Sequence, residues 1–127
     1  MTKILLSIHP QWVEKILKRE KKWEIRKTVP KKPEPYRIFI CQTGNVGVVG
    51  EFVCDYIEEC EPENLSEEWL RDTEVSLEQA KEYAGDSVLY KYRIRSVIEY
   101  SEPRPIGRYG VERTPQSWCY VPDELTV

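Results

Sequence analysis

Three charged side chains between residues 21 and 26 have the types and the spacing to form a binding site. In the run KKWEIR, Lys22, Glu24 and Arg26 share one face if the segment is a strand, and Lys21 stands at its start. A stiff strand fixes where charges point, so this face suits a polar or anionic ligand. Alternation alone favours the other interpretation, a solvated, salt-bridged strand face, because exposed faces of lysine, glutamate and arginine are ordinary.

The sequence around these charges resembles the opening of ASCH domains, a family of the PUA-like superfamily. The family signature G-x-K-x-x-E-x-R matches residues 19–26 and supplies Lys21, Glu24 and Arg26. Arg19 stands where the family has glycine. This departure concerns the turn, where glycine serves backbone geometry, and leaves the charged trio intact.

The end of the chain is similar to the same family. Residues 115–121 read PQSWCYV, like the closing segment of phage and bacterial ASCH proteins, so the resemblance spans nearly the whole chain. It implies a small mixed β-barrel and a link to RNA.

A pocket for a nucleobase needs an aromatic platform, polar groups that read base edges and a positive rim for phosphate. Guided by the family, we expect Trp118 to provide the platform, although buried aromatic residues more often belong to the core. Trp23 is assigned to the core. The other candidates for ligand binding are His9, Lys21, Lys22, Glu24, Arg26, Gln42, Thr43, Gln116 and Ser117.

The same trio allows an enzymatic interpretation. Lys21 would act as nucleophile or base if a dry pocket lowers its pKa, Glu24 would carry protons, and Arg26 would stabilise an anion. The resemblance implies two such activities: some ASCH proteins hydrolyse acylated cytidine with a lysine, a threonine and a distant glutamate, and others have been assigned ribonuclease activity. Glu24 replaces that threonine, and no acid from Glu51 onward can be named as the distant partner.

His9 is the only histidine, and it lies where a predicted strand ends and a helix begins. One interpretation places it in the cleft with Lys21 and Glu24, as a ligand contact or as the base of a ribonuclease. The other is a helix-capping or surface histidine. The sequence leaves both open.

The distribution of charge limits the partners. The net charge is −3, yet residues 1–37 hold eleven basic and four acidic residues, a net +7, and residues 51–86 hold two and thirteen, a net −11. An anionic partner fits the basic end, unless the two halves pair with each other. Overall acidity argues against non-specific coating of nucleic acid and leaves a small, focused contact.

Length and composition predict one domain over residues 1–127. The chain has no apolar run of membrane-spanning length and no secretory signal, so we expect a cytoplasmic protein without membrane contact. The four cysteines are scattered, and Cys41 and Cys54 lie in apolar runs typical of the core. Neither a metal nor another cofactor is expected.

Hydrophobic periodicity predicts the elements that position the site. Residues 3–8 form a strand, and a helix begins at Pro10 and ends near Arg19. A proline-rich loop at residues 29–35 follows the charged strand. The apolar face of the helix consists of Trp12, Val13, Ile16 and Leu17.

The middle of the chain is predicted to contain a hairpin of residues 36–41 and 46–56. Gly47 and Gly50 predict a bulge or a close backbone approach in its second strand, the device by which small barrels bend. The acidic stretch that follows is predicted to carry two helices, and then come a long strand and a short last strand. These elements are a helix from Ser66, a helix from Ser76 to Gly85, a strand at 88–100 and a strand at 118–121.

Strands with inserted helices make an α+β domain, in agreement with the small PUA-like mixed barrel that the resemblance implies. The predicted function is binding of RNA, single-stranded nucleic acid or a modified nucleoside at Lys21, Glu24 and Arg26, and a small hydrolase is the alternative.

A third interpretation is a protein-interaction module on the acidic helices. Charge reversal at Glu67, Glu68 or Glu78 would then abolish capture of the partner.

Overall fold

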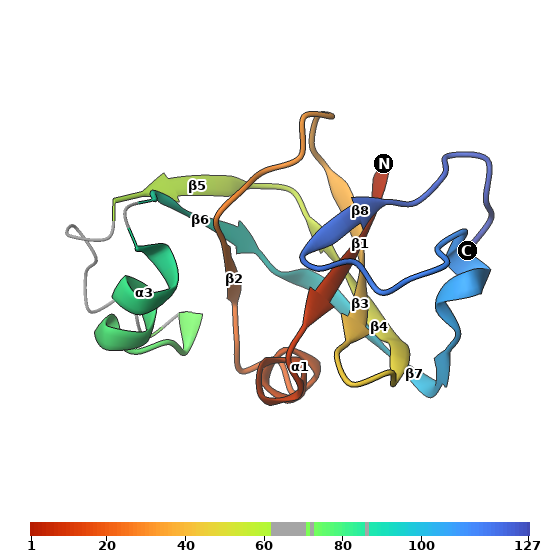
Figure 1. Cartoon of the computed structure of the whole chain (residues 1–127), viewed down its shortest axis with the longest axis horizontal. Coiled ribbons are helices and arrows are strands. Elements are labelled where there is room, and N and C mark those ends of the chain that lie inside the picture. The colour runs from red at the N-terminus through yellow and green to blue at the C-terminus, as the bar shows by residue number, and fades with distance from the viewer. Residues whose placement is uncertain (62–70, 72, 86) are drawn as a thin grey trace.

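The computed structural model describes residues 1–61, 71, 73–85 and 87–127. Its strands form a five-stranded sheet in the order β7-β4-β3-β1-β8 and a three-stranded sheet in the order β2-β6-β5 (Figure 1). The elements are β1 (Thr2–Ile8), α1 (Pro10–Leu17), β2 (Trp23–Arg26), β3 (Tyr36–Gln42), β4 (Gly47–Cys54), β5 (Ile57–Cys60), α3 (Leu77–Ala84), β6 (Leu89–Arg93), β7 (Arg95–Arg104), a 3-10 helix η2 (Ile106–Tyr109) and β8 (Trp118–Tyr120).

β1 pairs with a strand on each side, and its side chains are buried on both faces. It pairs parallel to β3 and antiparallel to β8. Ile4 and Leu6 belong to one buried cluster and Leu5 to another. An apolar strand with both faces buried makes a rigid support. Ser7 lies near the end of β1, so this rigid strand fixes its position.

The predicted hairpin is confirmed, with β3 antiparallel to β4. The pairing of β4 with β7 shifts register between Val48 and Gly50, so the predicted irregularity is confirmed as well. A Cβ atom on Gly50 would lie 2.5 Å from the carbonyl oxygen of Ile98. Glycine is required there because the backbones of β4 and β7 approach so closely.

α1 begins at Pro10, as predicted, and buries Val13 and Ile16. Its regular part ends at Leu17, two residues before the predicted end. Arg19 has a φ of 62°. This left-handed backbone favours glycine, the residue of the family pattern, and Arg19 adopts it without glycine's freedom.

The predicted strand at 88–100 is interrupted. β6 ends at Arg93, β7 begins at Arg95, and Ser96 has a φ of 53°. β6 pairs with β2 and β5, whereas β7 pairs with β4. The chain thus passes from one sheet to the other, and the described strands form two sheets and no closed barrel. The predicted α+β class holds; the predicted barrel is not confirmed.

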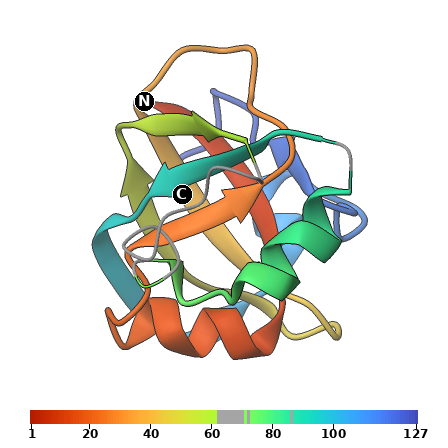
Figure 2. The same cartoon turned by 90° about the vertical axis from the view of Figure 1, so that its left-hand side faces the viewer.

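α3 confirms the predicted helix after Ser76. The Ser76 hydroxyl accepts a hydrogen bond from the Gln79 amide, the Gln79 side chain caps Ser76 in return, and Gly85 is the C-cap. Ala80 and Ala84 pack in one cluster with Ile25, so α3 lies beside β2 (Figure 2).

Two predictions concern residues outside the described part of the chain: the helix from Ser66, and the roles of Glu67 and Glu68 in a protein-interaction module. No helix among the described residues is long and apolar enough to cross a membrane.

Candidate functional site

A cavity of about 880 Å³ opens among the end of β1, the start of α1, β2, α3 and the segment before β8. Its volume lies within the range of about 300–1,000 Å³ that is usual for small-molecule sites. The predicted site residues that line it are His9, Lys21, Glu24, Arg26, Thr43, Gln116 and Ser117.

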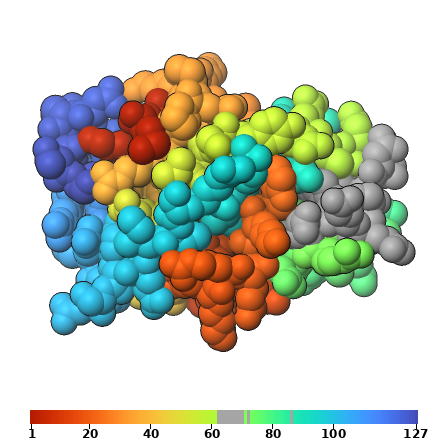
Figure 3. Space-filling view, turned by 180° about the vertical axis from the view of Figure 1, so that it is seen from behind, coloured from red at the N-terminus to blue at the C-terminus, as the bar shows by residue number. Residues whose placement is uncertain are grey.

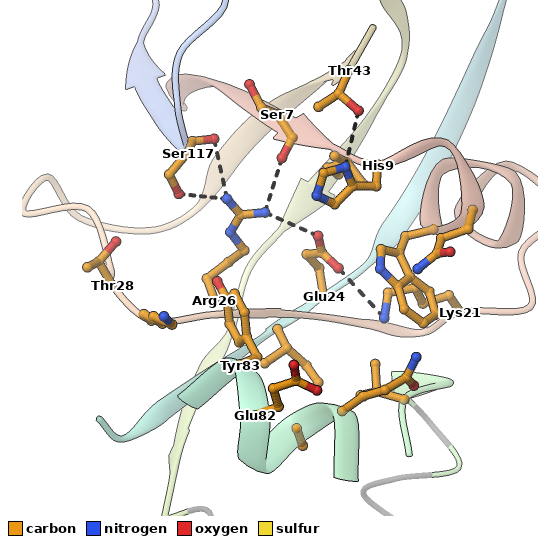
Figure 4. Close-up of a pocket in the computed structure, with 18 of the residues that line it drawn as sticks. Ser7, His9, Lys21, Glu24, Arg26, Thr28, Thr43, Glu82, Tyr83 and Ser117 are labelled. Atoms are coloured by element: carbon orange, nitrogen blue, oxygen red, sulfur yellow. Dashed lines mark hydrogen bonds and ion pairs between the residues drawn. The ribbon is translucent and has the colours of Figure 1, made fainter. Parts of the chain in front are cut away.

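Glu24 lies between two cations on the cavity wall (Figure 4). Its Oε1 is 3.6 Å from Lys21 Nζ, and its Oε2 is 3.5 Å from Arg26 Nη1. The exposed fractions of the side chains are 1% for Lys21, 6% for Glu24 and 11% for Arg26. Two buried cations and one carboxylate leave a local charge of +1, which suits an electron-rich or anionic ligand.

Lys21 is engaged on three sides. Its ammonium group donates to the carbonyl oxygen of Thr73, pairs with Glu24 and lies 4.9 Å from the centroid of the Trp12 ring. Burial lowers the pKa of Lys21 below its usual range, and the negative charge of Glu24 limits the shift. A neutral amine is therefore more accessible at Lys21 than at an exposed lysine.

Arg26 forms hydrogen bonds that link β2 to the end of β1 and to the segment before β8. Its Nη1 donates to the carbonyl oxygen of Ser7 over 3.1 Å, and its Nη2 donates to Ser117 Oγ over 2.6 Å. Arg26 Nε is buried and has no hydrogen-bond partner among the described residues. A buried donor without an acceptor is costly, so a ligand or water that supplies one is favoured here.

His9 lies at the cavity. It occupies the N-cap position of α1 but makes no side-chain capping bond, and its Nδ1 lies 3.2 Å from Thr43 Oγ1. His9 is therefore not a side-chain cap of α1. It is exposed as well as lining the cavity, so the cleft and the surface interpretations both remain. Thr43 comes from the turn after β3, so two segments far apart in sequence form this wall.

Three predicted site residues do not line the cavity: Lys22, Gln42 and Trp118. β2 begins at Trp23, so Lys22 lies outside the regular strand, and its side chain is exposed. The Trp118 indole donates to Thr28 Oγ1 over 3.0 Å, and Thr28 does line the cavity. Trp118 therefore positions the rim of the cavity and is not its aromatic wall.

The aromatic wall comes from residues that the sequence did not identify. Trp12, predicted as core, lines the cavity, as does Tyr83 of α3. The ammonium group of Lys27 lies 4.7 Å from the centroid of the Tyr83 ring. Tyr83 lies within the predicted helix from Ser76 to Gly85, but nothing local in the sequence indicates that this helix lies beside β2.

The cysteines behave as core residues. Cys41 and Cys54 are buried, as predicted, and Cys60 and Cys119 are half-buried. Within the described part of the chain, no three His, Cys, Asp or Glu side chains are grouped to hold a metal ion.

The two sheets, the helix-to-strand turn and the inserted helices define an α+β domain. The sequence profile of the ASCH domain family matches residues 6–125, and the chain belongs to this family. The family is generally thought to bind RNA. A search of curated proteins finds no match.

Solved structures of ASCH from Zymomonas mobilis share the fold. The protein itself matches with a TM-score of 0.83 at 20% identity, covering 96% of this chain and 89% of the other. A tyrosine-to-phenylalanine variant matches with a TM-score of 0.84 at 20% identity, covering 98% and 93%. A serine-to-alanine variant matches with a TM-score of 0.83 at 19% identity, covering 96% and 89%. At this identity the likeness shows the fold alone.

Proposed function

We propose that the cavity binds one unpaired nucleotide of RNA, or the corresponding modified nucleoside. The observation that carries this proposal is the buried network of Lys21, Glu24 and Arg26 on the cavity wall. This network offers hydrogen-bond donors and an acceptor that are shielded from water. A ligand that does not match them leaves buried polar groups without partners, which costs free energy of binding. Base edges present both donors and acceptors, so they can complement such a wall.

Aromatic and hydroxyl groups complete the site. Tyr83 is 39% exposed and lines the cavity, so it takes the stacking role first assigned to Trp118. His9 with Thr43, and Ser117 with Gln116, supply further polar groups on different walls.

Phosphate recognition at this site is limited. Lys27 is the exposed lysine among the lining residues, and the acidic Glu82 lies at the same cavity. One phosphate contact on single-stranded RNA gives a slope of about −0.7 in log affinity against log salt. The protein should therefore select its ligand through the base more than through the backbone.

A hydrolase remains the second candidate, favoured by the lowered pKa of Lys21. Lys21 Nζ already donates to the carbonyl oxygen of Thr73 and pairs with Glu24. Nucleophilic attack would require that ammonium group to lose a proton and to leave these partners. Binding requires neither step, and so it is placed first.

The test is calorimetric titration with nucleosides, their acylated and methylated forms, and short single-stranded RNA. Tyr83→Ala should weaken binding of the ligand found by about fivefold or more, the value of one stacked base, while Tyr83→Phe retains it. Leu77→Ala is the matched control, since Leu77 lies on the same helix, is 41% exposed and is not a lining residue.

Two results would overturn the proposal: no ligand bound by the wild type, or equal affinity for Tyr83→Ala and wild type. Mass spectrometry of the incubated ligand separates the two candidates. Turnover that is lost in Lys21→Met would establish the hydrolase.

A further inference from the structure

β2 presents Trp23 on the face of the strand opposite Glu24 and Arg26. Glu24 and Arg26 line the cavity, so the alternation of the strand turns Trp23 the other way. Trp23, predicted to belong to the core, is half-buried there, and its ring lies edge-to-face with Tyr56, the centroids 6.0 Å apart. Tyr56 is 42% exposed.

Cations from β6 and β7 surround these rings. Lys91 Nζ lies 4.3 Å from the centroid of the Trp23 ring, and the guanidinium carbon of Arg93 lies 5.3 Å from that of Tyr56. The side chain of Arg95 is 55% exposed. We call Trp23, Tyr56, Arg93 and Arg95 the aromatic–basic surface; Lys91, which is only 8% exposed, is a buried neighbour of Trp23.

Among the described residues, two carboxylates pair with these cations. Asp55 pairs with Arg93 at 3.1 Å and with Arg95 at 3.7 Å, and Glu58 pairs with Lys91 at 3.5 Å. The single carboxylate of Asp55 is thus shared by two guanidinium groups. The long Arg95 pair is exposed, so it contributes little and can exchange for a phosphate contact.

Figure 3 shows the segments of this surface together. Residues 20–26 (orange), 55–61 (yellow-green) and 88–100 (cyan) meet on one side of the molecule.

We propose that the aromatic–basic surface is a second contact for single-stranded RNA. A base stacks on Tyr56, whose neighbouring guanidinium group extends the platform, and Arg95 contacts the adjoining phosphate. Aromatic rings beside arginines bind single strands with little sequence preference, because every base has a π face. The proposal rests on the proposed function for the choice of RNA as partner, but it uses none of the cavity residues.

Two sites on one chain predict a dependence on ligand length. A nucleoside fills the cavity alone, whereas a strand long enough to reach both sites gains affinity because the second contact becomes intramolecular. A protein partner on this surface would instead leave RNA affinity independent of Tyr56.

The experiment compares a nucleoside with single-stranded oligouridine of about 12 nucleotides, a length within the usual site sizes of single-strand binders. Tyr56→Leu should weaken binding of the oligonucleotide by about fivefold or more and leave nucleoside affinity unchanged, and Tyr56→Phe should restore it. Arg95→Ala should reduce the salt slope for the oligonucleotide by about 0.7. Arg108→Ala, the same change at an exposed arginine of η2, is the control.

The outcomes separate this inference from the proposed function. Wild-type affinity of Tyr56→Leu for the oligonucleotide overturns the surface contact. If Tyr83→Ala is then impaired, the cavity function stands. Loss in Tyr56→Leu with a silent Tyr83→Ala would support the surface and contradict the cavity. A wild-type protein that binds neither probe refutes both.

Discussion

Removal of the Glu24 carboxylate tests whether the charged trio is one buried unit. Glu24→Gln leaves two cations without their counter-ion, and the exposed fractions of these side chains are only 1% for Lys21 and 11% for Arg26. Breaking a buried ion pair by removing one partner costs about 3–5 kcal/mol. Typical domains have about 5–15 kcal/mol of unfolding free energy in all.

The effect is large enough to measure by urea unfolding, with tryptophan fluorescence as the signal. For a chain of this size a loss of about 3–5 kcal/mol lowers Tm by about 10–20 °C. Lys21→Met in the Glu24→Gln background removes one orphaned charge. The double variant should therefore be more stable than the sum of the single effects predicts, by about 1 kcal/mol or more.

Glu14→Gln is the matched control. Glu14 pairs with Lys18 at 2.7 Å, but both side chains are more than half exposed, so no measurable change is expected. A Glu24→Gln variant as stable as Glu14→Gln, or strictly additive effects at residues 21 and 24, would refute the buried unit.

Three further predictions concern ionisation and packing. The pKa of Lys21 in the folded protein is lowered from 10.5. In the pH range between that lowered pKa and 10.5, Lys21 is therefore mostly neutral in the folded protein and mostly protonated in the unfolded chain. Unfolding free energy should then rise with pH relative to Lys21→Met, by at most about 1.4 kcal/mol per unit, as measured by urea unfolding across that window. Burial raises the pKa of Cys54 to about 12, so iodoacetamide near pH 8 should alkylate half-buried Cys60 first in peptide mass spectra, and equal rates would contradict the burial. Gly50→Ala should lose about 1–3 kcal/mol because its Cβ meets a backbone carbonyl of β7, while Gly107→Ala, with open space around it, should be near neutral in the same assay.

The local parts of the fold were predictable because their signals are local. Pro10 and the apolar spacing of α1, the serine cap of α3 and the glycines of β4 each act through neighbours in sequence. The break between β6 and β7 was not predictable, since the apolar alternation continues across it. The positive φ at Ser96 is imposed by pairing with different sheets.

The site was predictable where one strand carries it. Lys21, Glu24 and Arg26 lie within six residues: β2 carries Glu24 and Arg26, and Lys21 lies just before it, so one short segment brings all three to the cavity. Tyr83 could not be assigned, because its place depends on how α3 packs against Ile25. The surroundings of Trp118 were unpredictable for the same reason: its indole reaches Thr28, a contact that only the assembled fold creates.

The most direct test of the central claim is the NMR signal of the Arg26 Nε–Hε group during titration with the bound nucleoside or short RNA. This donor is buried and unpartnered among the described residues, and it belongs to the charged trio. We predict that it shifts in step with saturation while the Nε–Hε signal of Arg108 stays in place. Saturated binding with an unmoved Arg26 signal would contradict the claim that the ligand occupies this cavity.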